Sequence, residues 1–185
     1  MRLSKYLLLM LFFPLVLLSC SKGNEHITRD LYTRALPVSF DFPAITDSTK
    51  VITITEFKGS TNLDSLIRVA TNSQFGTEDI ESIRLSSLKM DVVNSDTTYN
   101  FRLLENLSVK LSSRSTLSDE LAKVTSNSDI ISQTINIPVT GPDVQLKDVF
   151  NAGNYNYVLF GKIRRKTSRS FKTTLTAQYR ITLAK

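Results

Sequence analysis

The side chains that most often carry out covalent or acid–base catalysis are scarce in this sequence. The chain has a single histidine, His26, and a single cysteine, Cys20, both close to its start. Histidine triads and Cys–His pairs need these residues held together by a folded scaffold, and cysteine/histidine zinc sites need several such ligands. We therefore expect neither kind of site, no bound metal and no cofactor.

Pairs of carboxylates are the remaining route to acid–base chemistry, since two of them suffice for glycoside hydrolysis. Asp79 with Glu81, and Asp119 with Glu120, are close in the sequence, and folding could bring either pair beside other acids. The simpler interpretation is that they are solvated residues at the ends of loops. The sequence contains no calcium-loop pattern and no glycine-rich phosphate loop. We expect a protein that is not an enzyme, with carboxylate-only glycosidase chemistry as the open alternative.

Tyrosines and asparagines cluster between residues 151 and 157. Tyr155 and Tyr157 alternate with Asn154 and Asn156, and Asn151 precedes them. Exposed tyrosine rings could stack on a sugar while the amides bond to its hydroxyl groups. The alternative is that the tyrosines enter the core and the asparagines form a loop, and we favour this second interpretation.

Six cations and no acid lie between residues 162 and 172. We expect the flanking strands to form a hairpin in which Lys172 opposes another cation, a mildly destabilising pairing. One interpretation is that these long side chains spread into water. The functional interpretation is a contact for anionic lipid headgroups, polysaccharide or an acidic envelope protein. The six residues are Lys162, Arg164, Arg165, Lys166, Arg169 and Lys172.

The first 19 residues are typical of a secretory signal peptide. Arg2 and Lys5 precede an apolar run from Tyr6 to Leu18, which is too short to span a membrane. The run ends at Leu17-Leu18-Ser19-Cys20, which resembles a bacterial lipobox. The resemblance implies cleavage after Ser19 and lipid modification of Cys20. A plain signal peptide and an uncleaved anchor are the alternatives.

Removal of residues 1–19 from the 185-residue chain leaves 166 residues, enough for one domain with a sizeable core. The formal charge falls from +6 to +4 when Arg2 and Lys5 are removed, so a nucleic-acid partner is not expected. Lipidation of the only cysteine leaves no thiol for an intramolecular disulfide. Stability must therefore come from burial of apolar surface.

Three short sequence patterns resemble the Asp-Ser/Thr-apolar acceptor used for O-glycosylation in one group of diderm bacteria. They begin at Asp47, Asp64 and Asp96. The second pattern lies in a predicted helix, so Ser48 and Thr97 are the candidate sites. A pattern this short also arises often by chance.

The spacing of apolar residues divides the remainder of the chain. Residues 20–35 are polar and mixed, and they predict a flexible tether. Pro37 and Pro43 bound a short edge strand over 38–42. A stripe of Leu63, Leu66, Ile67 and Ala70 predicts a helix over 62–71, with Thr61 and Asp64 at capping-box spacing. A second helical turn is expected over 144–150.

Strands are predicted for most of the rest of the chain. Alternation over 83–92 changes phase at Ser86-Ser87, which indicates a β-bulge. The final strand alternates without interruption from Phe171 to Leu183, and Leu175 and Tyr179 lie on its apolar face. The remaining predicted strands cover 51–55, 107–111, 121–124, 131–137 and 155–163.

These elements predict an all-β domain over 36–185, an antiparallel β-sandwich with one short helix, and a β-barrel is the alternative. The segment Val144–Phe150 leading into the last two strands resembles small immunoglobulin-like sandwich domains of diderm lipoproteins. This resemblance implies a fold and no chemistry. We expect a lipoprotein of the cell envelope, held in the outer membrane by its N-terminal lipid and acting as a non-enzymatic structural or interaction module. A surface carbohydrate- or ligand-binding module is the alternative.

Overall fold

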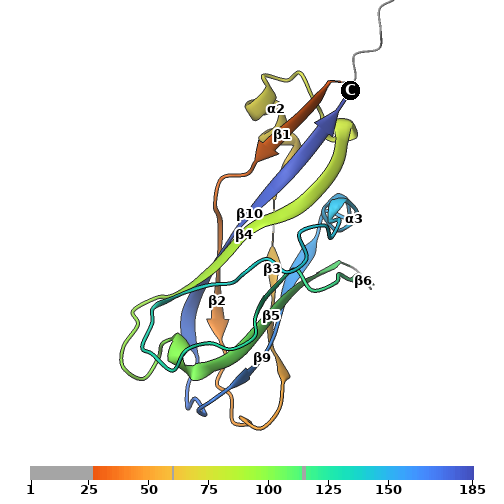
Figure 1. Cartoon of the computed structure of the whole chain (residues 1–185). Coiled ribbons are helices and arrows are strands. Elements are labelled where there is room, and N and C mark those ends of the chain that lie inside the picture. The colour runs from red at the N-terminus through yellow and green to blue at the C-terminus, as the bar shows by residue number, and fades with distance from the viewer. Residues whose placement is uncertain (1–26, 60, 114–115) are drawn as a thin grey trace, which may run out of the picture.

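The computed structural model describes residues 27–59, 61–113 and 116–185, which fold into two packed antiparallel sheets (Figure 1). The all-β antiparallel sandwich is confirmed, and the strands do not close into one barrel. One sheet, called sheet A here, contains β1 (Thr28–Tyr32), β2 (Leu36–Phe42), β4 (Ile80–Val92), β8 (Thr134–Asn136) and β10 (Phe171–Ala184). Sheet B contains β3 (Ile52–Gly59), β5 (Leu104–Ser113), β6 (Thr116–Leu117), β7 (Ala122–Val124) and β9 (Tyr155–Ile163).

The strand order is that of a jelly roll. Setting aside β1 and the two-residue β6, the strands pair from the outside inwards: β2 with β10, β3 with β9, β4 with β8, and β5 with β7. A long antiparallel ribbon wrapped into two sheets produces this nesting. The sandwich is therefore connected differently from the immunoglobulin-like domains that the sequence resembles, whose sheets have the orders ABED and CFG.

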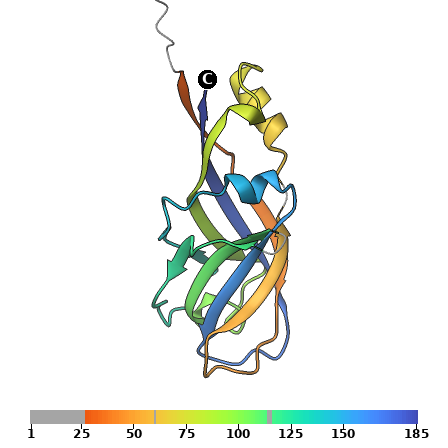
Figure 2. The ribbon, with the colours of Figure 1, turned by 90° about the vertical axis from the view of Figure 1, so that its right-hand side faces the viewer.

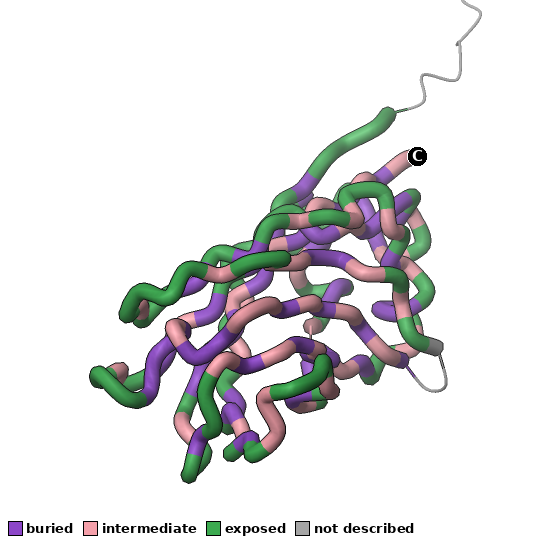
Figure 3. Tube along the Cα trace, turned by 60° about the horizontal axis from the view of Figure 1, so that its bottom comes forward, coloured by how far each residue is buried: buried purple, intermediate pink, exposed green. Residues whose placement is uncertain are grey.

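The core lies between the two sheets, and the buried residues alternate along the strands (Figure 3). On β10 every odd-numbered residue from Thr173 to Leu183 is buried, and Leu175 and Tyr179 are 0% and 1% exposed. The prediction that both belong to the core is confirmed. The predicted bulge on β4 is confirmed too, because Gln178 pairs with Ser87 while Tyr179 pairs with Leu85, which leaves Ser86 unpaired.

Helix α2 (Leu63–Thr71) lies at the end of the sandwich at which the C-terminus lies, and α3 (Lys147–Asn151) lies nearer the middle of the molecule, against β4 and β5 (Figures 1 and 2). Helix α2 buries Leu63 and Ile67, as its apolar stripe predicts. Its cap is Asn62, whose side chain accepts a hydrogen bond from the Ser65 backbone, so the capping box predicted from Thr61 is wrong. The second helical turn is confirmed as α3. The 3₁₀ turns are η1 (Thr77–Asp79) and η2 (Phe101–Leu103).

Within residues 27–59, 61–113 and 116–185 we find no helix whose length and hydropathy would let it span a lipid bilayer.

The flexible tether predicted for 20–35 is wrong for Thr28–Tyr32, which form β1; residues 20–26 lie outside the described part of the chain. Strand β1 pairs with the C-terminal half of β10, from Arg180 to Ala184, beyond the residues that pair with β2. The backbone N–H and C=O groups on that edge of β10 are the hydrogen-bond partners of β1. Only Leu31 of β1 is buried, so the strand has no apolar alternation that the sequence could reveal.

The predicted hairpin between the last two strands is also wrong, since β9 belongs to sheet B and β10 to sheet A. Both strands do bury odd-numbered residues, as the sequence predicts, but they do so from opposite sides of the core. Lys172 therefore lies opposite Asp41 on β2 and forms an ion pair of 2.9 Å with it. No cation opposes it across a hairpin.

Two tyrosines join the sheets through the middle of the core. Tyr157 on β9 and Tyr179 on β10 are each 1% exposed, and their hydroxyl oxygens are 2.7 Å apart. Burial raises the pKa of both phenols above the ordinary value. Tyr155, 3% exposed, bonds to Thr61, so the proposed sugar-stacking patch is wrong and the core interpretation of these tyrosines is confirmed.

We expect Tyr179→Phe to lower the free energy of unfolding by about 1–2 kcal/mol, because the Tyr157 hydroxyl group loses its buried partner. The double variant Tyr157→Phe/Tyr179→Phe should recover most of this loss, since neither hydroxyl group remains. Urea unfolding of both variants measures the difference. Additive losses in the double variant would show that the two hydroxyl groups do not depend on each other.

Candidate functional site

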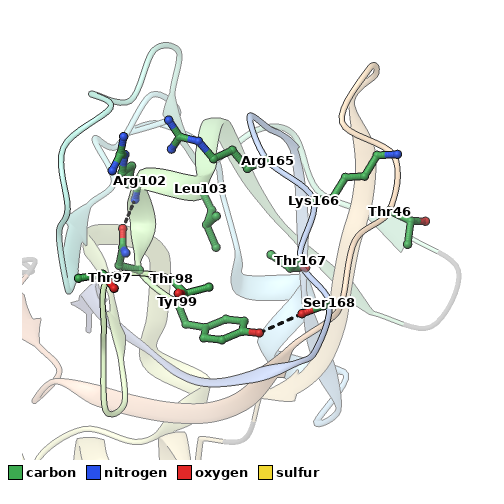
Figure 4. Close-up of a pocket in the computed structure, with 11 residues that line it drawn as sticks. Thr46, Thr97, Thr98, Tyr99, Arg102, Leu103, Arg165, Lys166, Thr167 and Ser168 are labelled. Carbon is green, nitrogen blue, oxygen red and sulfur yellow. Dashed lines mark hydrogen bonds between the residues drawn. The ribbon is translucent and has the colours of Figure 1, made fainter.

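A hollow of about 510 Å³, drawn in Figure 4, opens at the end of the sandwich opposite α2, where β2, β4 and β9 end (Figure 1). Three loops line it: 43–51 after β2, 93–103 after β4, and 164–170 after β9. The antiparallel order brings these loops together, because each of the three strands ends on the same side of the molecule (Figure 1). We call this hollow the end pocket; it is lined by Thr46, Thr97, Thr98, Tyr99, Asn100, Arg102, Leu103, Arg165, Lys166, Thr167 and Ser168.

Buried polar groups hold the wall of the end pocket in place. The Asn100 amide donates to the Asp96 carbonyl at 2.8 Å, and its oxygen accepts from the Arg102 backbone at 3.0 Å. The Tyr99 hydroxyl oxygen lies 3.2 Å from that of Ser168, and the Thr167 hydroxyl accepts from the Ile45 backbone at 2.7 Å. These bonds tie the three loops together, so the shape of the pocket is set before a ligand arrives.

Three cations line the end pocket: Arg102, Arg165 and Lys166. The Asp129 carboxylate contacts the two arginines. Arg102 Nε lies 2.7 Å from Asp129, and both terminal nitrogens of Arg165 contact the Asp129 carboxylate at 3.0 Å. Hydrogen bonds from Arg165 and Arg102 lower the pKa of Asp129 to about 2. Because Asp129 follows β7, the fourth loop at this end, 125–133, also orders the pocket rim.

Hydrogen-bond donors remain available on the rim. Within the described residues, neither the terminal Nη atoms of Arg102 nor Lys166 Nζ has a hydrogen-bond partner, and the same holds for the hydroxyl groups of Thr46, Thr97 and Thr98. Figure 4 shows Arg102 and Arg165 on one side of the hollow, and Lys166 and Thr46 on the other. Arginine and lysine donors of this kind bind carboxylate and phosphate oxygens.

The structure separates the six cations predicted as one anion contact. Only Arg165 and Lys166 line the end pocket. Lys162 pairs with Glu105 at 3.1 Å, Arg164 donates to backbone carbonyls, and Arg169 lies 4.4 Å from the centre of the Tyr99 ring. Lys172 pairs with Asp41 and Arg165 with Asp129, so five of the six cations already have partners within the protein.

The third cation of the pocket, Arg102, was not found from the sequence. It stands alone between Phe101 and Leu103, more than sixty residues before Arg165. Local spacing therefore carries no signal for it. Knowledge of the jelly-roll order would have been required, since that order places the loop after β4 beside the loop after β9.

Among the described residues, Thr97 is the one other candidate that lines the end pocket. Ser48 is half-buried in the loop after β2, while Thr97 is exposed on the pocket rim. Cys20 lies outside the described residues. Asp79 accepts from the Gly76 backbone and Glu120 from Ser108, and within the described residues no three His, Cys, Asp or Glu side chains gather as a metal site would require.

No family model, curated protein or solved structure matches this chain.

Proposed function

We propose that this protein is a lipid-anchored lipoprotein of the bacterial cell envelope whose jelly roll is a non-enzymatic binding module. The observation that carries the proposal is the end pocket, in which cations and hydroxyl groups from separate loops face one hollow. Among the residues that the structure describes, its lining offers hydrogen-bond donors and contains no carboxylate or imidazole. Such a lining suits the binding of an anionic or polar ligand, so it favours the ligand-binding interpretation over a purely structural role.

The position of the pocket supports a module that reaches away from its membrane. Thr28, at the start of β1, pairs with Ala184 at the far end of β10, whereas the pocket loops adjoin Phe171. Strand β10 has 14 residues, so these two ends lie about 45 Å apart at roughly 3.3 Å per residue. A lipid on Cys20 would hold the molecule by the end at which β1 begins. In an upright orientation the pocket faces away from that membrane, which we take to be the outer membrane.

Replacement of Cys20 by alanine should abolish lipid modification, because the thiol is the acceptor of the diacylglycerol group. We expect the variant to accumulate as an uncleaved precursor without acyl mass on its N-terminal peptide. Intact-mass spectrometry of membrane and soluble fractions measures both effects. Cleavage at another site, together with a free Cys20 thiol in the wild-type protein, would contradict the anchor.

A glycan array probed with the full-length protein in detergent tests the binding module. Selective binding to a class of glycans supports the proposal, and loss of that binding in Arg102→Gln would assign it to the end pocket. Arg68→Gln is the matched control, since Arg68 lies in α2 at the opposite end and also pairs with an acid. An array without selective binding would favour the structural role.

O-glycosylation of Ser48 or Thr97 remains a proposal. Thr97 lies on the rim of the end pocket, so a glycan there would compete with a ligand for the same space. Ser48 does not line the pocket. Peptide mass spectrometry of protein from its native host would show which of the two sites carries a sugar, and therefore whether the pocket stays open.

A further inference from the structure

We infer that the end pocket binds an acidic sugar, with the acid group held by Arg102 and the sugar hydroxyl groups held by Lys166 and the threonines of the rim. The inference rests on the proposed binding function and names its ligand class. It concerns a single sugar unit or the end of a polysaccharide, since a hollow of about 510 Å³ is in the range of small-ligand sites.

The charge balance around the pocket favours an anion. Three residues that line it are cations, Arg102, Arg165 and Lys166, against the Asp129 carboxylate that two of them contact. Asp96 accepts hydrogen bonds of 2.7 Å from the backbone of both Thr98 and Tyr99, so its charge is directed into its own loop. A net excess of two positive charges remains at the pocket.

Arg102 and Arg165 use different nitrogens to contact Asp129, and this difference identifies the donors that can bind an acid group. Arg165 uses both terminal nitrogens on Asp129. Arg102 contacts the same carboxylate through Nε, and its Nη atoms have no hydrogen-bond partner among the described residues. Asp129 thus fixes the Arg102 guanidinium group in one orientation without occupying its outer edge. A guanidinium group that is already held in one orientation loses less conformational freedom on binding a carboxylate or phosphate than a freely moving one does.

The hydroxyl groups distinguish a sugar from a simple ion. Thr46, Thr97 and Thr98 come from two different loops, and within the described part of the chain their hydroxyl groups have no hydrogen-bond partner. A hydroxyl group can both donate and accept, which matches the hydroxyl groups of a carbohydrate. A small inorganic anion would leave these groups, and most of the volume of the hollow, unused.

An anionic membrane is the main competing partner, since its headgroups are also acidic. The pocket lies about 45 Å along β10 from the end at which β1 begins. An upright molecule anchored through residues before β1 would hold the pocket away from its own membrane. The sugar is therefore favoured over the lipid headgroup as the source of the acid group.

Isothermal titration calorimetry with the full-length protein in detergent tests the inference. The probes are a galacturonic acid tetramer, a neutral galactose tetramer and inorganic phosphate, and phosphatidylglycerol vesicles are used with protein reconstituted in neutral lipid. We expect binding of the acidic tetramer, with at least tenfold weaker binding of the other three. Lys166→Gln should weaken it about tenfold, the low end for a hydrogen bond to a charged group.

Lys166 is exposed and has no partner among the described residues, so its replacement should not disturb folding. Arg102→Gln should weaken binding to a similar extent, while Arg68→Gln should leave it unchanged. Equal affinity for the acidic and neutral tetramers would overturn the inference, and so would preferential binding to the vesicles or to phosphate. An equal loss in Arg68→Gln would show that overall charge, and not the pocket, attracts the sugar. The tetramer and phosphate titrations do not depend on acylation of Cys20, which is tested separately.

Discussion

Leu175→Ala is expected to lower the free energy of unfolding by about 2–5 kcal/mol, the largest loss we anticipate from one core substitution. Leu175 is fully buried at the middle of sheet A, where it lies between Val38 of β2 and Met90 of β4. Its side chain faces sheet B across the core. The neighbouring strands are fixed by their backbone hydrogen bonds, so they cannot move far enough to fill the cavity that alanine leaves.

Thr176→Ala is the matched control, because Thr176 is the next residue of the same strand and points to the outer face of sheet A. It is half-buried and lies between Pro37 and Lys89. We expect its replacement to change the free energy of unfolding by less than about 1 kcal/mol. Urea unfolding of the two variants measures the difference. Similar losses for both would mean that the inner and outer faces of β10 are assigned wrongly.

Arg164→Met is expected to lower the free energy of unfolding by about 2–3 kcal/mol, the range for hydrogen bonds made by a charged group. The half-buried Arg164 guanidinium donates to the backbone carbonyls of Leu104 and Asn127, and it lies 3.4 Å from that of Arg102. Methionine retains most of the aliphatic length and removes all the donors. The carbonyl groups at the start of β5 would then lose their charged partner.

This substitution should also loosen the pocket without removing any residue that lines it. Asn127 lies in the loop 125–133, which also carries Asp129, the carboxylate that orients Arg102 and Arg165. Hydrogen exchange of the 125–133 amides should therefore accelerate in Arg164→Met. Lys166→Met, which removes an exposed cation without a partner in the described structure, should change neither stability nor exchange appreciably. Unchanged exchange in Arg164→Met would show that the loop is held by other contacts.

The features that the sequence determined are those set by neighbouring residues. Alternation from Phe171 to Leu183 specified the inner face of β10, because successive side chains of a strand point to opposite sides. The phase change at Ser86-Ser87 specified the bulge for the same reason. The stripe of Leu63 and Ile67 specified α2, although the capping residue proved to be Asn62. The burial of Tyr155 and Tyr157 also followed from their phase on β9.

Which strands pair with each other was decided only by the tertiary structure. The apolar face of β10 could pack in a hairpin with β9 or in the opposite sheet, and local alternation is the same in both arrangements. The choice depends on burying both sheets together, and it placed Lys172 beside Asp41. The tertiary structure also determined that β1 pairs with β10, although only Leu31 of that strand is buried.

The end pocket depends on the same choice. Its loops have no periodic pattern, and Arg102, Asp129 and Arg165 belong to three separate loops of the chain. They meet because the jelly roll returns its strands to one end of the sandwich. Strand faces are determined by local geometry and are therefore readable from the sequence, whereas contacts between distant loops arise only once the whole ribbon has wrapped around its core.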